Sequence, residues 1–193
     1  MLLWKPHYVF AVPRLVQSMH KSIQAGIKKQ GLLARRLASL AELVCRAHLL
    51  ALDTWRNQIL KAAPPPFALR LLAAAAALLL WPLKKVADML VWSRVLQSTG
   101  GRIKVLVSGG SHLPLFLDEF FAAVGLRVIT GYGLTETGPV ISNRHAECNV
   151  LGSVGEPLPG VEIKLCDRST GERLAPGTSG LIFVKTPSLC KAT

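Results

Sequence analysis

Glycines and threonines surround one tyrosine and one acid in the sequence ITGYGLTETGPV, residues 129–140. Glycines allow a backbone to come close to a ligand and to expose its N–H groups. The Thr135 hydroxyl is suited to a phosphate oxygen, Glu136 offers an oxygen ligand to a hard cation such as Mg²⁺, and the Tyr132 ring can stack on a purine. These residues indicate a nucleotide-binding loop, while a plain turn in which Glu136 is only hydrated is the alternative.

A strand, a helix and a second strand are predicted just before and into this loop. Residues 103–107 are rich in β-forming side chains and lead into Ser108-Gly109-Gly110, and residues 127–130 form a similar short segment. Between them, the apolar pattern predicts a helix that stops at Gly125. Strand, helix and strand within about 30 residues make a βαβ unit, so we expect a parallel sheet. Glycine-rich loops after both strands should then lie side by side at the ligand-binding edge of the sheet. The helical residues expected on one apolar face are Leu115, Phe116, Phe120 and Val124.

The first half of the chain has helical periodicity. Residues 12–61 are expected to form two helices with a natural break at Gly31, and the prolines at 64–66 must interrupt any helix that reaches them. The apolar residues that recur at helical spacing are Leu15, Met19, Ile23 and Ile27 in the first stretch and Leu33, Leu37, Leu40, Val44 and Leu52 in the second.

Positive charge is concentrated in the same half. The chain of 193 residues has a formal net charge of +12. Residues 1–104 contain 16 Lys and Arg against three acids, whereas residues 105–193 contain seven against eight. The positive charges alternate with leucine and alanine rather than with exposed aromatic residues, so we do not expect a nucleic-acid surface.

An apolar segment, LRLLAAAAALLLWPLKKVADMLVW, covers residues 69–92. Its uncharged run from Leu71 to Leu83 has 13 residues, fewer than the roughly 20 that span a bilayer. Three interpretations are open: a buried core helix, a helix lying in the membrane plane with Lys84 and Lys85 near anionic lipid, and a transmembrane helix. We therefore expect a peripheral membrane contact through residues 69–92 as one outcome.

The C-terminal part has the alternation of antiparallel strands. Residues 161–166 and 180–185 are predicted to be strands separated by a turn at residues 167–172. The cysteines contain no CxxC pair and no nearby histidine at metal spacing, which argues against a zinc site and a disulfide framework and favours a reducing compartment. The four cysteines are Cys45, Cys148, Cys166 and Cys190.

Several motifs, in order along the chain, resemble one enzyme family. GYGLTETGPV is similar to the hallmark motif of the adenylate-forming, or AMP-binding, enzymes, and VLVSGGSHLP at residues 105–114 resembles the segment that flanks their adenine. Residues 149–185 resemble the next block. KPHYVFAVPRLVQSMHKSI is similar to a segment of the long-chain fatty-acid members, and the insertion with ALLLWPLKK is most similar to plastid acyl-acyl-carrier-protein synthetases. The resemblance extends over essentially the whole chain.

The resemblance implies a role for residues in both loops. Thr135 is implied to touch the α-phosphate of ATP and Glu136 to coordinate Mg²⁺, which makes both candidate catalytic residues. His112 departs from the small residue or proline usual after the Ser-Gly-Gly segment, and a surface position or a ligand contact is open for it. The residues implied to bind the nucleotide are Gly109, Gly110, Ser111, Thr130, Gly131, Tyr132, Gly133 and Thr135.

The implied fold is an α/β partial adenylation domain. It divides into a helical, basic part (1–102), a βαβ segment with the adenine and magnesium loops (103–148) and a β-rich segment of antiparallel strands (149–193), without the C-terminal lid domain. The implied reaction joins a fatty acid, through an acyl-adenylate, to the thiol of CoA or acyl carrier protein, with ATP and Mg²⁺. The implied location is the plastid or another membrane-associated compartment.

Some parts of the family pattern are not found in these 193 residues. They include the Thr-rich loop for the β- and γ-phosphates, the Thr-Gly-Asp segment and the small domain with its lysine. We therefore expect the chain to correspond to a fragment of a longer fatty-acid ligase and to be inactive alone. The alternative is a catalytically dead, membrane-peripheral helical binding module that retains a relic nucleotide loop.

Overall fold

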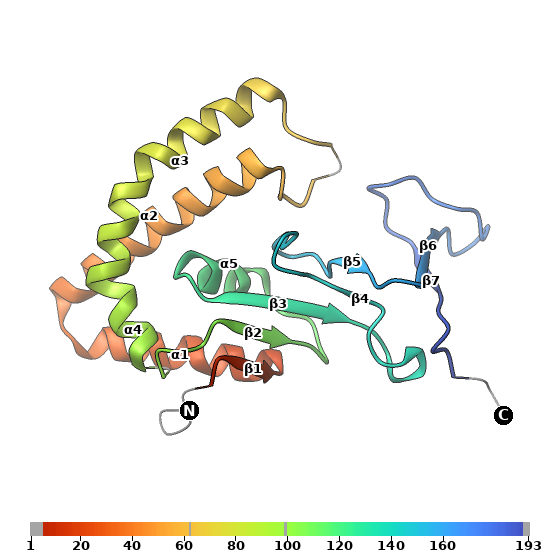
Figure 1. Ribbon diagram of the computed structural model, residues 1–193, viewed down its shortest axis with the longest axis horizontal. Helices are drawn as coiled ribbons and strands as arrows, with labels where there is room; N and C mark the ends of the chain where they lie inside the picture. The colour runs from red at the N-terminus through yellow and green to blue at the C-terminus, as the bar shows by residue number, and fades with distance from the viewer. Residues whose placement is uncertain (1–5, 62, 99, 191–193) are drawn as a thin grey trace.

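A mixed sheet occupies the centre of the computed structural model, which describes residues 6–61, 63–98 and 100–190. The strand order is β1-β2-β3-β4-β5, and β6 and β7 form a separate pair beyond it (Figure 1). The strands are β1 (Tyr8–Ala11), β2 (Val105–Ser108), β3 (Arg127–Tyr132), β4 (Ser142–Asn143), β5 (Glu156–Pro157), β6 (Glu162–Cys166) and β7 (Leu181–Lys185). The helical segments are α1 (Pro13–Lys29), α2 (Leu32–Arg56), α3 (Phe67–Ala87), η1 (Asp88–Trp92), α4 (Ser93–Ser98), α5 (Leu115–Ala123) and η2 (Thr135–Thr137).

The predicted βαβ unit is confirmed by the pairing of β2 with β3. These strands are parallel, with Ser108 opposite Thr130, and α5 connects them. Strand β1, which the sequence analysis did not predict, pairs in parallel with the other side of β2 and places Ala11 opposite Ser108. Strands β4 and β5 continue the sheet in antiparallel fashion. The carboxyl ends of three parallel strands therefore meet at one edge.

Helix α5 covers the sheet with a face that matches the predicted one only in part, since Phe120 and Val124 are buried as expected. Leu115 and Phe116, expected on the apolar face, are 46% and 48% exposed, whereas Leu117, Phe120 and Phe121 are fully buried. The helix is apolar almost all round, so its composition does not identify the inward face, and contact with the sheet and with α1 and α2 selects it. Because Leu117, Phe120 and Phe121 all turn inward, α5 forms the centre of the core. The largest buried hydrophobic side chains of that core are Trp92, Phe120, Phe121, Leu106, Leu117 and Leu126.

Helices α1 and α2 break at Gly31 as predicted, with φ +94° at this residue. The buried stripe of α2 differs from the prediction, because Leu33, Leu37 and Leu40 are half or more exposed. Small side chains face inward instead, and they allow α3 to pack closely along α2. The buried residues of α2 are Ala38, Ala41, Cys45, His48 and Ala51.

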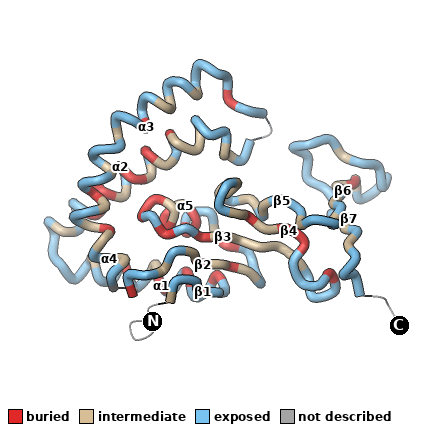
Figure 2. The backbone as a smooth tube through the Cα atoms, viewed as in Figure 1, coloured by how far each residue is buried: buried red, intermediate tan, exposed pale blue. Residues whose placement is uncertain are grey.

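Helix α3 continues through a π-helical turn and α4 as one apolar helix, Phe67–Gln97, of 31 residues. By length and composition it could cross a membrane, yet only 6% of its most apolar window is buried in the protein. Figure 2 shows α3 exposed along most of its length, whereas α2 alternates between buried, intermediate and exposed positions. The interpretation of this segment as a buried core helix is therefore wrong. At its far end, Trp92 in the π-helical turn is buried and packs edge-on against Phe120.

The C-terminal strands pair as predicted. Strands β6 and β7 are antiparallel, with Glu162 opposite Lys185. In the turn that follows β6, the Ser169 hydroxyl and the backbone N–H groups of Ser169 and Thr170 donate hydrogen bonds to Asp167, which lowers the pKa of that carboxyl to about 2. This turn keeps Asp167 ionised and ordered at the surface.

Candidate functional site

A cavity of about 430 Å³ opens at the carboxyl ends of β2 and β3. Residues 110–113 after β2, residues 130–134 at the end of β3 and residues 152–154 form its walls, together with Asp118 of α5. Its volume lies within the range of about 300–1,000 Å³ that is usual for small-molecule sites. The two glycine-rich loops picked out from the sequence therefore share one cavity.

The loop after β2 contributes most of its predicted residues. Gly110 and Ser111 line the cavity, and so does His112, which settles its position at the site rather than elsewhere on the surface. Gly109 is not part of the lining; its N–H donates to the Ala11 carbonyl at 3.4 Å, which ties the loop to β1. Gly110 has φ +84°, a left-handed backbone conformation that favours glycine.

The end of β3 and the residue that follows it contribute four predicted residues in succession. Thr130, Gly131, Tyr132 and Gly133 all line the cavity. A Cβ atom at Gly133 would lie 1.9 Å from the carbonyl oxygen of Pro139. Glycine is therefore required here because the chain folds back on itself to pass β4 beside β3, and this close approach explains part of the glycine density of the motif.

Thr135 and Glu136 lie in η2, just outside the cavity lining. Both residues are exposed, and the 3₁₀ turn is held by Thr137, whose hydroxyl accepts from the Leu134 N–H at 3.1 Å and donates to the Leu134 carbonyl at 2.9 Å. Leu134 itself lines the cavity, so Thr135 and Glu136 follow directly from its rim. Their roles toward phosphate and Mg²⁺ stay predictions. A single carboxylate fits Mg²⁺, which usually takes one or two from the protein and further oxygens from phosphates and water.

A buried ion pair, which the sequence analysis missed, supports the cavity. The Arg144 guanidinium donates to both carboxylate oxygens of Asp118, at 2.7 and 3.0 Å, and the Arg144 side chain has no exposed surface. Arg144 also donates to the Val150 carbonyl at 3.2 Å, while Asp118 accepts from the Gly152 N–H at 3.0 Å. The pair fixes the loop at residues 150–152 against α5. The two partners are 26 positions apart, and no local motif links them.

The loop at residues 152–154 is also tied to the neighbouring strands. The Thr130 hydroxyl donates to the Ser153 carbonyl at 3.2 Å, and the Ser142 hydroxyl donates to the Val154 carbonyl at 3.1 Å. Threonine and serine hydroxyls of the sheet thus hold the third wall of the cavity by its main chain. A small shift of β3 or β4 would therefore be transmitted to this wall.

The cavity is suited to binding a flat polar group rather than to covalent chemistry. Its described lining consists of main chain, apolar side chains, the hydroxyls of Ser111, Thr130 and Ser153, the Tyr132 ring, His112 and a carboxylate already paired with arginine. Lysine, arginine and cysteine are absent from that described lining. Exposed main-chain groups and an aromatic ring can recognise a base by hydrogen bonding and stacking.

The fold and the cavity define an α/β protein with a cavity at the carboxyl edge of parallel strands, the edge where such sheets commonly bind ligands. The model of the family described as AMP-binding enzyme matches residues 3–192, and the chain belongs to this family.

Relatives from Arabidopsis thaliana match almost the whole chain. "Probable acyl-activating enzyme 16, chloroplastic" is 38% identical over 97% of this chain and 27% of its own length. "Long-chain-fatty-acid--[acyl-carrier-protein] ligase AEE15, chloroplastic" is 36% identical over 97% of this chain and 26% of its own length. The chain thus spans about a quarter of the length of these relatives. Among solved structures, ATP-bound MatB from Rhodopseudomonas palustris is 33% identical over 51% of this chain and 21% of that chain, with a TM-score of 0.44.

Proposed function

We propose that this chain supplies the adenine pocket of an ATP-dependent ligase that joins long-chain fatty acids to a thiol. The observation that carries the proposal is the single cavity shared by residues 110–113 and residues 130–134. Membership of the AMP-binding enzyme family supports the nucleotide. The printed names of the two Arabidopsis relatives support an acyl substrate and, for one of them, acyl carrier protein as the thiol partner.

In the proposed reaction, the fatty-acid carboxylate attacks the α-phosphate of ATP to form an acyl-adenylate and pyrophosphate. The thiol of CoA or acyl carrier protein then takes the acyl group and releases AMP. Catalysis of this kind depends on positioning and on neutralising charge rather than on a protein nucleophile. A cavity lined by main chain and hydroxyl groups is consistent with that demand.

Each part of the site has a proposed task. Gly110, Ser111 and Gly131 hold the base through main-chain groups, and the Tyr132 ring stacks on it. Thr135 donates its hydroxyl to a phosphate oxygen, and Glu136 supplies an oxygen ligand to Mg²⁺, which when bound neutralises phosphate charge. These two roles are supported by the position of η2, which is exposed and follows directly from Leu134 at the cavity rim.

Replacing the cavity tyrosine tests the base pocket. Tyr132→Ala should weaken ATP binding to the full 193-residue chain by roughly 5- to 150-fold, because base–aromatic stacking contributes about 1–3 kcal/mol. Isothermal titration calorimetry measures the change. Tyr8→Ala is the matched control, because Tyr8 is the other tyrosine of the chain and lies 64% exposed on β1, outside the cavity. If both variants and the unaltered chain bind ATP with equal affinity, the proposed adenine pocket is rejected.

Replacing the η2 acid tests the proposed magnesium ligand separately. Glu136→Gln should reduce the gain in ATP affinity that Mg²⁺ gives, while the affinity for adenosine stays unchanged. Glu172→Gln, an exposed acid in the turn after β6, should leave both affinities unchanged. A loss of adenosine affinity in Glu136→Gln would contradict a role confined to the metal.

Contact with a membrane surface is a second proposed function. The observation that favours it is the 31-residue apolar helix Phe67–Gln97, of which 6% of the most apolar window is buried. Arg70, Lys84 and Lys85 lie on the same helix, and the Lys85 ammonium lies 5.7 Å from the centre of the Trp81 ring. Apolar side chains beside cations and an interfacial tryptophan are typical of helices that lie in the headgroup region. We also propose a plastid location, since both Arabidopsis relatives are named as chloroplastic.

Vesicle sedimentation tests the membrane contact. The chain should bind vesicles containing anionic lipid more tightly than neutral vesicles, and salt should weaken the binding. Lys85→Glu should lower the affinity by roughly 5- to 30-fold, since each cation near an anionic surface contributes about 1 kcal/mol. Lys28→Glu, at the exposed end of α1, is the matched control and should have little effect. Equal binding to neutral and anionic vesicles, or no binding to either, would reject this proposal.

A further inference from the structure

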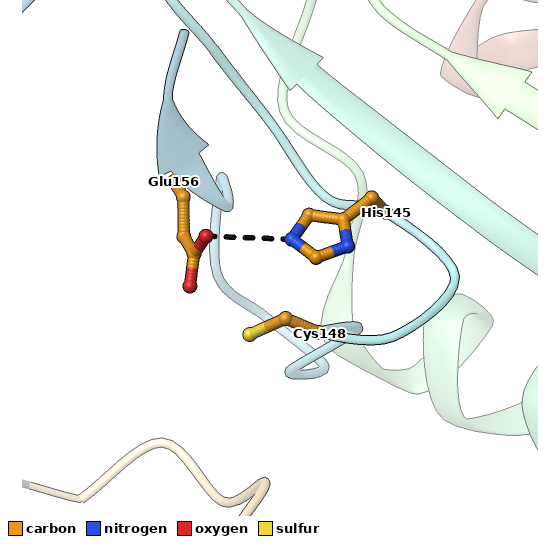
Figure 3. A group of neighbouring side chains, drawn as sticks. All are labelled: His145, Cys148 and Glu156. Carbon is orange, nitrogen blue, oxygen red and sulfur yellow. Dashed lines mark hydrogen bonds and ion pairs between the residues drawn. The ribbon is translucent and has the colours of Figure 1, made fainter. Parts of the chain in front are cut away.

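A histidine, a cysteine and a glutamate converge beside the loop that follows β4. Their ligand atoms, one from each of His145, Cys148 and Glu156, all lie within 4.8 Å of one another. His145 Nε2 lies 3.3 Å from a carboxylate oxygen of Glu156. Figure 3 shows the imidazole Nε2 and the cysteine sulfur both directed toward the glutamate side chain.

The sheet brings these residues together and holds them. Asn143 of β4 pairs with Glu156 of β5, so the glutamate lies next to the start of the loop. The His145 N–H donates to the Cys148 carbonyl at 3.3 Å, which closes the loop on itself. Arg144, immediately before the histidine, is anchored by its backbone N–H to Thr130 and by its side chain to Asp118. The three side chains therefore project from a well-supported backbone.

The donor set and its spacing would suit a divalent transition metal. Imidazole nitrogen, thiolate sulfur and carboxylate oxygen are the three ligand types of zinc in proteins. Bonds of about 2.0–2.3 Å in tetrahedral geometry put neighbouring donors roughly 3.3–3.8 Å apart. One pair of ligand atoms is already 3.3 Å apart, and all three lie within 4.8 Å of one another. Small side-chain rotations would bring them to the spacing of a tetrahedral site.

A nucleophilic cysteine is a weaker interpretation of the same group. Figure 3 shows the His145 Nε2 facing Glu156 and the Nδ1 on the opposite side of the ring, so neither nitrogen is directed at the thiol as a base. Burial and the Glu156 carboxylate raise the pKa of the Cys148 thiol, which is the reverse of what activates a nucleophile. A bound cation would offset this carboxylate and favour the thiolate.

We propose that His145, Cys148 and Glu156 form a zinc-type metal site with its fourth position open to water. On binding, the Cys148 thiol releases its proton to solvent and a metal–sulfur bond forms. The site joins both ends of the segment 145–156, which contains the wall of the cavity at residues 152–154. The metal would therefore brace that wall. The proposal overturns the expectation from cysteine spacing, which overlooked the histidine three positions before Cys148.

Cobalt(II) is the probe, because a thiolate ligand gives it a charge-transfer absorption band that nitrogen and oxygen ligands do not give. The full chain, untagged, reduced and metal-free, should bind one Co²⁺ with this band and with the visible absorption of a tetrahedral site. Zn²⁺ should displace the cobalt and remove both signals. Absence of the thiolate band at saturating Co²⁺ would overturn the proposal.

Variants assign the ligands. Cys148→Ser should abolish the thiolate band and weaken Zn²⁺ binding by more than about 100-fold, since even residues that only support a ligand change metal affinity by roughly 10- to 100-fold. Cys190→Ser, which removes an exposed cysteine elsewhere, should leave the band and the affinity unchanged. Unchanged Zn²⁺ affinity in Cys148→Ser, or loss of the band in Cys190→Ser, would refute the assignment.

A measurement on the unaltered chain keeps the test independent of variant folding. Zn²⁺ should slow alkylation of Cys148 by iodoacetamide at least about tenfold, because the metal-bound thiolate is shielded. Peptide mass spectrometry reports Cys148 and Cys190 in the same sample, and the rate at Cys190 should not change. Equal rates at Cys148 with and without Zn²⁺ would overturn the proposal.

Discussion

Two regions of the molecule bury opposite kinds of side chain. Apart from Trp92, which packs against Phe120, the helical arm, residues 32–98, buries mostly small residues such as Ala41 and Ala77 and exposes large ones, with Leu79 76% exposed. The cavity wall buries polar groups instead. We define this wall as residues 108–113, 130–134 and 142–155, together with the Asp118 side chain that supports them. Its polar residues with 2% exposure or less are Ser108, Asp118, Ser142 and Arg144.

This difference indicates what holds each region in place. In the arm, α2 and α3 adhere through non-directional packing of small side chains, which tolerates change at the outer surface. In the wall, directional hydrogen bonds and a buried ion pair fix the main chain, and a buried polar group that loses its partner is strongly destabilising. We therefore expect the wall to be sensitive to single substitutions and the arm to be tolerant.

Removal of the buried arginine should give the largest effect. Arg144→Leu leaves the Asp118 carboxylate buried without its cation, and breaking such a pair costs about 3–5 kcal/mol of stability. Urea unfolding at pH 7 measures the free energy of unfolding. Adding Asp118→Asn to this variant should recover part of the loss, because the neutral amide needs no counter-charge.

An arginine of the arm is the matched control. Arg46 also contacts two carboxylates, Glu42 at 2.9 Å and Glu119 at 3.2 Å, but these groups are 25–40% exposed. Exposed pairs contribute about 0–1 kcal/mol, so Arg46→Leu should change the stability by no more than that. Equal losses at Arg144 and Arg46 would show that burial does not separate the two regions.

A methyl group added to a wall glycine should give the next largest effect. A Cβ at Gly155 would lie 2.0 Å from backbone atoms of Asn143, in a strand that cannot move without losing its pairing with β5. Gly155→Ala should therefore destabilise the chain by about 3 kcal/mol, since conformational strain alone costs about 1–2 kcal/mol at its φ of +83°. Thermal or urea unfolding monitored by circular dichroism measures the loss.

Gly31, just before the arm, separates the cost of backbone strain from the cost of a steric clash. Gly31 has a similar φ of +94°, and nothing lies within 4 Å of its Cβ position. Gly31→Ala should lose only the strain contribution, about 1–2 kcal/mol. If Gly31→Ala and Gly155→Ala lose the same stability, the backbones at Gly155 and Asn143 are less closely packed than the structure indicates.

The elements that could be predicted from sequence are those that short-range patterns encode. The strands around α5 and the glycine-rich loops after them are encoded within about 30 residues, the size of a βαβ unit. Their parallel pairing placed Gly110, Ser111, Thr130, Gly131 and Tyr132 around one cavity, as expected. The break at Gly31 was equally local, because a glycine in this conformation ends a helical pattern.

What could not be predicted depends on contacts between distant residues. The pairing of Asp118 with Arg144 depends on how α5 lies over β3, and strand β1 is only four residues long, so its sequence alone is a weak signal. The inward face of α2, and that of α5 at Leu115 and Phe116, were misjudged for a related reason. Both helices have apolar residues on several faces, so their partners decide which residues are buried.

A partly buried acid in the arm gives a smaller, pH-dependent effect. Burial raises the pKa of Asp53 to about 6 from 3.8, although nearby Arg56 opposes the shift. Between about pH 4 and pH 6, Asp53 is protonated in the folded chain but ionised in the unfolded chain. The stability that Asp53 contributes therefore falls as the pH rises through this range. Because the carboxyl keeps partial contact with water, Asp53→Asn should raise the stability at pH 7 by about 1–2 kcal/mol.

Urea unfolding between pH 4 and pH 7 should show a flatter profile in Asp53→Asn than in the unaltered chain. Asp167→Asn is the control of opposite sign, because hydrogen bonds from Ser169 and Thr170 lower the pKa of Asp167. Its contribution is present above pH 4 and is lost as the pH falls toward 2, so the same titration is extended from pH 4 to pH 2 to measure it. An unchanged slope in Asp53→Asn would mean that this carboxyl is well solvated and that the arm carries no poorly paired charge.

Polar substitution on the outer surface of the arm should have the smallest effect on stability. Leu79 is 76% exposed, so Leu79→Gln should change the free energy of unfolding by no more than about 0.5 kcal/mol. Leu117→Ala in α5, where the side chain is fully buried, should cost about 2–5 kcal/mol. Vesicle binding should respond in the reverse order, with Leu79→Gln weakening it and Leu117→Ala, at tolerated temperatures, leaving it intact. A loss of more than 1 kcal/mol in Leu79→Gln would show that the leucines of the arm pack against the chain itself. The arm would then be as sensitive to substitution as the cavity wall, and the contrast between the two regions would not hold.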